Sequence, residues 1–375
     1  MMSVEDLGKK LLGEIEEVGL DEILSDLRFQ QAADSTCHFG LAQMDTLIRG
    51  VMDTHAGPAK RQQVPAPMVE LMSQYPGGGK THLLYHLTAL AVLPTSLGGR
   101  QAAVLYFDTD RHFSVPRLAQ QIQRLALAHG GEPFNKTETK NMIRECLKHV
   151  HIFKPSSLAN TVHTLNNIAK YLFNPLRHHS FDRAIAFIAI DSASAFYWQA
   201  RLESDQANLA SFTIASKKTA AEEHHPPPPI GYNDLASALK SASRTLSTPV
   251  IYTARDYNPP QLSRQQVQQH QSSAFSSHLN AFSYRPCLPS PFHSLPTLRF
   301  VIRRADVRKL PAGISFEEAA RENAIRKEVV ALGKFECFVN EWGVDEKVME
   351  KLRARGAMFE VFITGEGVKI GDGPE

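Results

Sequence analysis

The chain has 375 residues, 43% of them hydrophobic, and a formal net charge of +2 at pH 7. So small a charge excludes binding of nucleic acid through overall basicity, and any contact with DNA must come from local patches or from partners. Because the first residues lack the apolar core of a signal peptide and no apolar run reaches the length of a membrane span, we expect a soluble intracellular protein that does not associate with membranes.

The N-terminal part of the chain is predicted to be helical. Apolar residues recur at helical spacing between residues 4 and 28, in two groups separated by Gly19. We therefore assign residues 1–53 to an N-terminal helical segment with a linker, and residues 54–375 to the main core.

The stretch from residue 68 to residue 93 organises the rest of the chain. Its pattern predicts a short apolar strand, a glycine-rich turn and a helix with leucines on its buried side. The turn ends in five consecutive residues of the phosphate-binding type: Gly77, Gly78, Gly79, Lys80 and Thr81. In this context the backbone N–H groups converge on anionic oxygens, Lys80 adds a cation and the Thr81 hydroxyl can ligate Mg²⁺. The alternative is a flexible turn with a chance lysine, which the flanking elements disfavour.

Acidic residues follow the next predicted strand, residues 102–109, a continuous apolar run typical of a strand buried on both faces of a parallel sheet. Asp108 and Asp110 stand at its carboxyl end, where open α/β sheets bind ligands. Asp110 is therefore a candidate for a catalytic role. The alternative is that each aspartate caps the following turn, and this alternative weighs more for Asp108.

Residues 183–190 predict a further core strand, which ends in Asp191. A carboxylate at that strand end can hold Mg²⁺ through its water shell beside the Thr81 oxygen. The alternative is an aspartate that merely ends a core strand. The metal role is favoured by the order of the elements along the chain. Another strand and several helices lie between Lys80 and Asp191, as a doubly wound sheet requires.

Later segments are assigned by composition and periodicity. Disordered insertions are expected near residues 203–230, which contain four consecutive prolines, and near residues 256–283, which are rich in Gln and Ser. The remaining predicted elements are two strands, an inserted helical segment and a final hairpin: residues 249–253, 298–302, near 310–356, and 359–364 with 368–370.

The glycine-rich loop, the strand that ends in FDTD and the strand that ends in Asp191 together resemble the core of RecA-family recombinases. Resemblance to the recombinase paralogues of that family is carried by five blocks: LLYHLTALAVLP, AAVLYFDTDRHFSVPRL, IDSASAFYW, YRP and FEVFITGEGV. It implies an α/β fold, a RecA-like P-loop NTPase core with a mostly parallel twisted sheet, helices on both faces and antiparallel strands at the C-terminal end.

The resemblance also implies a function. It points to a subunit of a hetero-oligomeric complex of recombinase paralogues that acts in homologous recombination and double-strand-break repair in the nucleus. Single-stranded or branched DNA would be reached through the complex. The implied cofactors are ATP and Mg²⁺, held by the loop residues named above and by Asp191. Phe29 and Ala32 match the FxxA motif by which RecA-type recombinases grip a neighbouring subunit, but two fixed residues favour a chance match.

Three departures from the family pattern predict a weakened nucleotide site. The loop has Gln74 where GxxxxGK[ST] requires glycine. The acid that polarises the attacking water is usually glutamate, and Asp110 is one methylene shorter, which reduces its reach. Arg255 and Asp256 occupy the region of the family's glutamine that senses the γ-phosphate. We therefore expect ATP binding to be weak or lost and hydrolysis to be slow or absent.

Three functions remain open. The first is a non-catalytic or weakly ATP-binding platform within a recombinase-paralogue complex, and the second is an active DNA-stimulated ATPase with Asp110 as base. The third, an unrelated phosphate-loop kinase or transporter subunit, is disfavoured because the sequence has no arginine-rich lid. Phe196, Tyr197 and Trp198 favour a protein interface over base stacking.

Overall fold

The computed structural model describes residues 38–55, 65–129, 135–215, 229–255, 283–305, 307 and 313–371. Within them, the strands form one nine-stranded sheet. Their spatial order is β3 (Val150–Phe153), β2 (Ala103–Asp108), β4 (Ile185–Asp191), β5 (Val250–Arg255), β1 (Met68–Ser73), β6 (Leu298–Arg304), β7 (Lys334–Val339), β8 (Met358–Thr364) and β9 (Gly367–Ile370). Neighbours from β3 to β6 pair in parallel, and β6 to β9 pair antiparallel.

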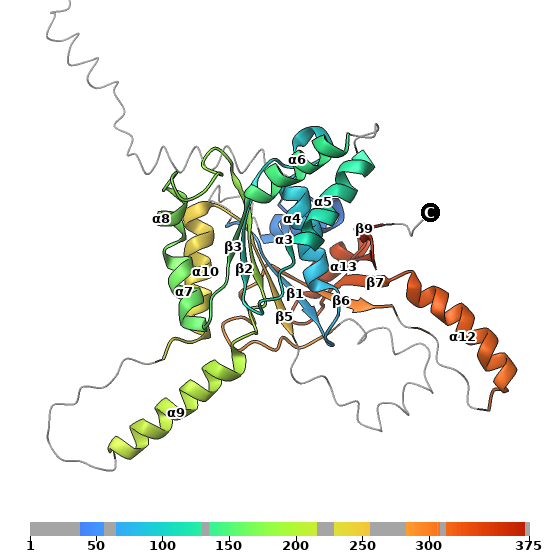
Figure 1. Ribbon diagram of the computed structural model, residues 1–375. Helices are drawn as coiled ribbons and strands as arrows, with labels where there is room; N and C mark the ends of the chain where they lie inside the picture. Colours follow the sequence, from blue (N-terminus) through green and yellow to red (C-terminus); the bar gives the residue numbers. More distant parts are fainter. Residues whose placement is uncertain are drawn as a thin grey trace, which may run out of the picture. The chain divides into compact units, whose positions relative to one another are not determined.

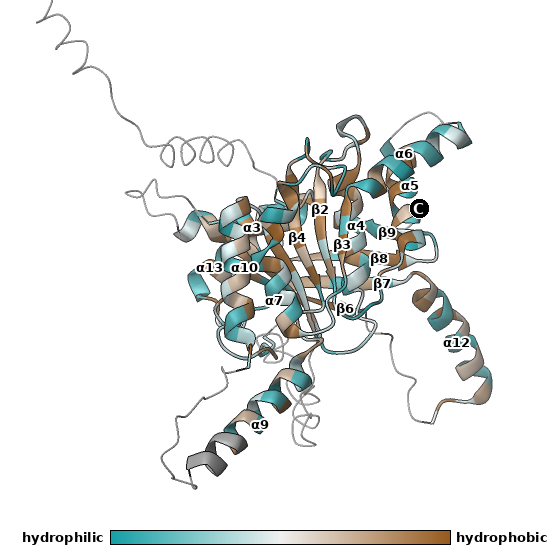
Figure 2. Ribbon diagram, turned by 60° about the vertical axis from the view of Figure 1, so that its left-hand side comes forward, coloured by the Kyte–Doolittle hydropathy of each residue, from teal (hydrophilic) through white to brown (hydrophobic). Residues whose placement is uncertain are grey.

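The parallel strands are apolar because both of their faces are covered. On β2, Val104 and Tyr106 contribute to one hydrophobic cluster, whereas Leu105 and Phe107 contribute to the other. This alternation follows from the two-residue period of a strand, and it explains why the sequence shows a continuous apolar run. Figure 2 shows β2 and β4 coloured mostly as hydrophobic.

Helices cover the two faces of the parallel strands (Figure 1). One face carries α3 (Ala42–His55), α4 (Lys80–Val92), α5 (Val115–His129) and α6 (Lys136–Lys148), with the short η1 (Thr95–Leu97) after α4. The other face carries α7 (Leu158–Asn166), α8 (Ile168–Leu172) and α10 (Tyr232–Leu246). The predicted fold class is therefore confirmed. Among the described residues, no helix has the length and apolar character to cross a membrane.

The segment near residues 310–356 is not wholly helical, which corrects the expectation from sequence. It contains α12 (Phe316–Ala331) and α13 (Glu346–Ala354), but β7 lies between them and pairs with both β6 and β8. Phe335 and Cys337 of β7 are buried, and they alternate with the more exposed Lys334 and Glu336. This period-two pattern is that of a half-buried strand, and the neighbouring helical patterns obscured it.

Two other predicted boundaries differ from the structure. The helix α9 (Tyr197–Ala215) runs through the first half of the insertion expected near residues 203–230, of which residues 216–228 lie outside the described part of the chain. The insertion expected near residues 256–283 lies outside them too, except for its last residue. At the N-terminal side, Phe39 and Met44 are fully buried in the main hydrophobic cluster. Core packing therefore begins before residue 54.

Candidate functional site

The glycine-rich loop between β1 and α4 is shaped by the absence of side chains. Gly77 and Gly79 have φ angles of 74° and 87°, in the left-handed region that favours glycine. A Cβ atom at Gly78 would lie 2.5 Å from Ser73 Cβ, and one at Gly79 would lie 2.7 Å from Ile363 Cδ1. The loop therefore lies tightly against β1 and β8, with its backbone free to face a ligand.

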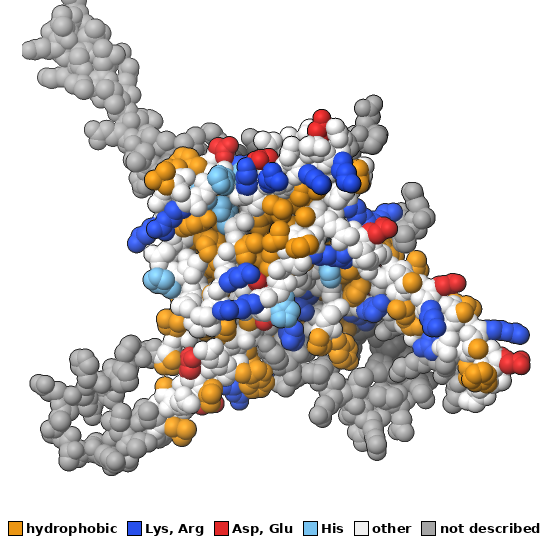
Figure 3. Space-filling view, in the orientation of Figure 1, with side chains coloured by type: hydrophobic (Ala, Val, Ile, Leu, Met, Phe, Trp, Pro, Cys, Tyr) orange, Lys and Arg blue, Asp and Glu red, His pale blue; other side chains and the backbone are white. Residues whose placement is uncertain are grey.

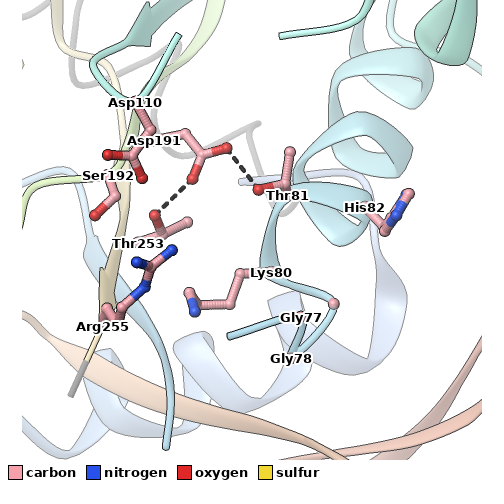
Figure 4. Close-up of a pocket in the computed structure, with 11 residues that line it drawn as sticks. Gly77, Gly78, Lys80, Thr81, His82, Asp110, Asp191, Ser192, Thr253 and Arg255 are labelled. Carbon is pink, nitrogen blue, oxygen red and sulfur yellow. Dashed lines mark hydrogen bonds between the residues drawn. The ribbon is translucent and has the colours of Figure 1, made fainter. Parts of the chain in front are cut away.

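A pocket of about 230 Å³ opens beside this loop. Its lining includes every residue predicted for the site: Gly77, Gly78, Gly79, Lys80, Thr81, Asp110 and Asp191. Lys80 and Thr81 are the first residues of α4, whereas the two acids come from the carboxyl ends of β2 and β4. The topology thus brings together residues that are 110 positions apart, as the hydrogen bond between Thr81 and Asp191 shows (Figure 4).

Asp191 is the hydrogen-bond centre of the pocket. Its Oδ2 accepts from Thr81 Oγ1 at 2.8 Å and from the Tyr106 hydroxyl at 2.9 Å, while its Oδ1 accepts from Thr253 Oγ1 at 2.7 Å. All three donors are neutral hydroxyls. These bonds fix the orientation of the carboxylate without pairing it with a cation.

Lys80 is largely buried, and its ammonium donates a hydrogen bond to the Ser73 hydroxyl. Ser73 in turn donates to the carbonyl oxygen of Tyr75 at 2.9 Å. Burial lowers the pKa of Lys80 to about 8, although the negative charge of Asp191 opposes that shift. An anionic ligand in the pocket should stabilise the charged form of Lys80, because its negative charge compensates for the hydration that burial removes.

The two aspartates at the carboxyl end of β2 have different surroundings. Asp108 is buried, and its carboxylate accepts hydrogen bonds from the backbone N–H groups of His112 (2.9 Å) and Phe113 (3.2 Å). Asp108 therefore fixes the turn, as the alternative interpretation of the sequence held. Asp110 lines the pocket, where burial, with a further contribution from the charge of Asp191, raises the pKa of its carboxyl group.

The residues present fit a magnesium nucleotide. The side-chain-free loop at the N-terminus of α4 provides N–H donors for phosphate oxygens. The Thr81 hydroxyl and the Asp191 carboxylate, in direct contact, are the oxygen ligands that Mg²⁺ prefers. No group of three or more His, Cys, Asp or Glu side chains suited to a metal ion occurs in the described part of the chain. A metal held here would thus depend on phosphate oxygens and water to complete its coordination.

Four further residues line the pocket that were not predicted as site residues: His82, Ser192, Thr253 and Arg255. Thr253 and Arg255 lie at the carboxyl end of β5, beside the end of β4, so the strand-end rule that found Asp191 also applies to them. In Figure 4 the Arg255 guanidinium points into the pocket, whereas His82 is turned away from the other labelled side chains.

Comparison with known proteins finds similarity to several DNA repair proteins. Over 131 residues it is 32% identical to the mouse (Mus musculus) DNA repair protein XRCC2, a match that covers 35% of this chain and 41% of that protein. Over 208 residues it is 26% identical to human (Homo sapiens) DNA repair protein RAD51 homolog 2, covering 56% of this chain and 43% of that protein. The chain resembles the recombinase paralogues of the RecA family.

A third relative extends this similarity to archaea. The DNA repair and recombination protein RadA of Methanoculleus marisnigri is 27% identical over 156 residues, which cover 41% of this chain and 40% of that protein. The match to each of the three relatives therefore spans about two fifths of that relative's length. No family model matches the chain.

Proposed function

We propose that the chain is a subunit of a recombinase-paralogue complex that acts in homologous recombination and double-strand-break repair in the nucleus. Its pocket would hold ATP with Mg²⁺ and hydrolyse it slowly or not at all. The names of the relatives support the repair role, since they are DNA repair and recombination proteins. The nucleotide role rests on one observation: a glycine loop, Lys80, Thr81 and Asp191 line a single pocket.

Each of these residues has a task that its geometry supports. The loop N–H groups and Lys80 would bind phosphate oxygens. Thr81 and Asp191, joined by a 2.8 Å hydrogen bond, would hold Mg²⁺, which supplies positive charge to the phosphates. Thr253 and Tyr106 keep the Asp191 carboxylate in place through their hydroxyl groups.

Asp110 supports a second candidate function, an active DNA-stimulated ATPase. Its raised pKa makes its carboxylate a better proton acceptor than an ordinary aspartate. Its short side chain argues the other way, because a general base must reach the attacking water within hydrogen-bond distance. We favour the weak or non-catalytic site for this reason.

The surface supports contact with DNA through the complex rather than through this chain alone. On the face shown in Figure 3, Lys and Arg side chains are spread among hydrophobic and neutral ones. Arg303, at the end of β6, already has a charge partner, since it forms an ion pair with Glu336 at 2.9 Å. Trp198, at the start of α9, has 54% of its surface exposed and is a candidate contact with a protein partner.

Turnover measurements separate the two functions. In the paralogue complex, we expect ATP turnover to be slow with and without single-stranded DNA, and we expect Asp110→Asn to leave that rate nearly unchanged. Asp110→Glu restores the missing methylene and is expected to raise the rate. DNA-stimulated turnover that Asp110→Asn abolishes would establish the ATPase instead.

A partner experiment tests the complex itself. The tagged chain, purified from nuclear extract under native conditions, is expected to bring down other recombinase paralogues in stoichiometric amounts. Lys80→Ala is expected to co-purify with them as well and to complement a repair-deficient cell, because the platform does not need turnover. Recovery as a lone stable monomer would contradict the proposal.

A further inference from the structure

We propose that Arg255 binds the terminal phosphate of a nucleoside triphosphate, so that the pocket supplies a second phosphate-binding cation from its own chain. This inference rests on the proposed nucleotide site and goes beyond it, because it names the residue that distinguishes a triphosphate from a diphosphate.

The backbone at Arg255 is held in a defined place. Arg255 is the last residue of β5 and pairs in register with Ser73, the last residue of β1 and the hydrogen-bond partner of Lys80. Its N–H donates to Ser194 Oγ at 3.0 Å, and its carbonyl oxygen accepts from Cys287 Sγ at 2.8 Å. The side chain therefore starts from a fixed position beside the loop.

The guanidinium reaches the pocket from the side opposite the loop. In Figure 4 it lies on the side of Thr253, away from Gly77 and Gly78, and the Lys80 side chain extends from the loop toward it. Its positive charge lowers the pKa of Lys80 and that of Asp110, so both groups lie within its electrostatic reach. The side chain itself is exposed, and a ligand can approach it without displacing core residues.

The position of Arg255, opposite the loop, determines which phosphate of the nucleotide it contacts. A loop of this kind holds the inner phosphates with its N–H groups, and the loop lysine reaches toward the outer ones. A cation on the far side of the pocket then meets the outermost phosphate. A guanidinium group binds two phosphate oxygens at once in a planar geometry. A diphosphate ends before it reaches Arg255, so it does not gain this contact.

Affinity measurements with two nucleotides test the inference. Calorimetry on the full chain, or on its complex, would give the dissociation constants of Mg·ATPγS and Mg·ADP for the wild type, Arg255→Ala and Arg255→Lys. We expect Arg255→Ala to weaken ATPγS binding about tenfold, the effect of losing one charge-assisted hydrogen bond, and ADP binding less than about twofold. Arg255→Lys should keep part of the preference because it keeps the charge.

The control is Arg304→Ala, at the end of β6 on the other side of β1. Arg304 donates to the Val330 carbonyl oxygen at 3.2 Å and lies over the Phe335 ring, so its loss should leave both affinities unchanged. If Arg255→Ala weakens both nucleotides equally, or neither, the inference is wrong and the nucleotide site stands. If the wild type binds neither nucleotide yet still co-purifies with paralogues, the inference and the nucleotide role both fail, and the complex-subunit role survives.

Discussion

Two sites in the same sheet hold opposite charges in different ways. Glu70 on β1 and Arg299 on β6 lie side by side in register and form a closed ion pair, with 2.7 Å between Arg299 Nε and Glu70 Oε2. Arg299 also donates to the carbonyl oxygens of Phe292 and His293, and its guanidinium lies over the Trp342 ring. The buried Glu70 carboxylate thus has its charge partner, Arg299, within the protein itself.

The pocket at the carboxyl end of the same strands is built on the opposite plan. Asp191 accepts from hydroxyls, and Lys80 donates to the Ser73 hydroxyl. Neutral partners orient these charges without neutralising them, so a ligand that brings phosphate and metal completes the site. The closed pair should therefore govern stability, whereas the pocket should govern binding.

The largest expected effect comes from opening the closed pair. Arg299→Ala leaves the Glu70 carboxylate buried without its cation, which should lower the free energy of unfolding by about 3–5 kcal/mol. Arg303→Ala is the matched control, because its pair with Glu336 is partly exposed and should contribute less than about 1 kcal/mol. Urea denaturation measures both, and equal losses of stability would contradict the contrast between the closed pair and the pocket.

The acid dependence of the Arg299→Ala variant sharpens that result. Burial raises the pKa of Glu70, and the Arg299 charge opposes the rise. A carboxyl group whose folded pKa lies above its unfolded value contributes stability that is lost as the pH rises, so the variant should regain stability when the pH is lowered from 7 to roughly 5. The double variant with Glu70→Gln has no such carboxyl group and should not regain stability in this way.

The pocket lysine should separate binding from stability. The folded pKa of Lys80 is about 8, against an ordinary value of 10.5, so between these values the unfolded chain holds more protons and wild-type stability rises with pH. Lys80→Met should flatten that rise and leave the chain at least as stable at neutral pH. It should also weaken ATPγS binding about tenfold to a hundredfold, because charge-assisted hydrogen bonds to phosphate are lost.

Denaturation between pH 7 and 10.5 and calorimetry check the two halves of this prediction. Lys334→Met is the control, since Lys334 pairs with Glu360 at the protein surface and should change neither the pH profile nor the affinity. A Lys80→Met variant that unfolds at neutral pH would place Lys80 with the structural charges and contradict the contrast between the sites.

Sequence patterns predicted the parts of this molecule that follow local rules. The strand, loop and helix around Lys80, the parallel sheet and the strand that ends in Asp191 are all present in the structure. The pair of Glu70 and Arg299 joins residues 229 positions apart, and no local period marks such a partnership. Arg255 was predicted only as a departure from the family pattern and not as a site residue, because the predicted strand stopped at residue 253, two residues short of the end of β5.

The smallest expected effect concerns the hydroxyls around Asp191. Thr253 is fully buried, and its Oγ1 donates to Asp191 Oδ1 at 2.7 Å. Thr253→Val keeps the shape of the side chain and removes that donor. Since Thr81 and Tyr106 still donate to the other carboxylate oxygen, and the pocket admits water, we expect a stability loss of only about 1 kcal/mol.

The effect of Thr253→Val on binding should exceed its effect on folding. With one oxygen released, the carboxylate turns more freely. The gain in ATPγS affinity that Mg²⁺ provides should therefore fall about tenfold, the low end of the effect of losing an outer-shell partner of a metal ligand. Thr248→Val is the matched control, because this buried hydroxyl donates to the Leu246 carbonyl oxygen at 2.8 Å and its removal should cost similar stability. Its Mg²⁺ dependence should stay that of the wild type. If both variants instead lose the same share of Mg²⁺ dependence, the hydroxyls around Asp191 only support the fold, and the pocket resembles the closed pair more than its open geometry indicates.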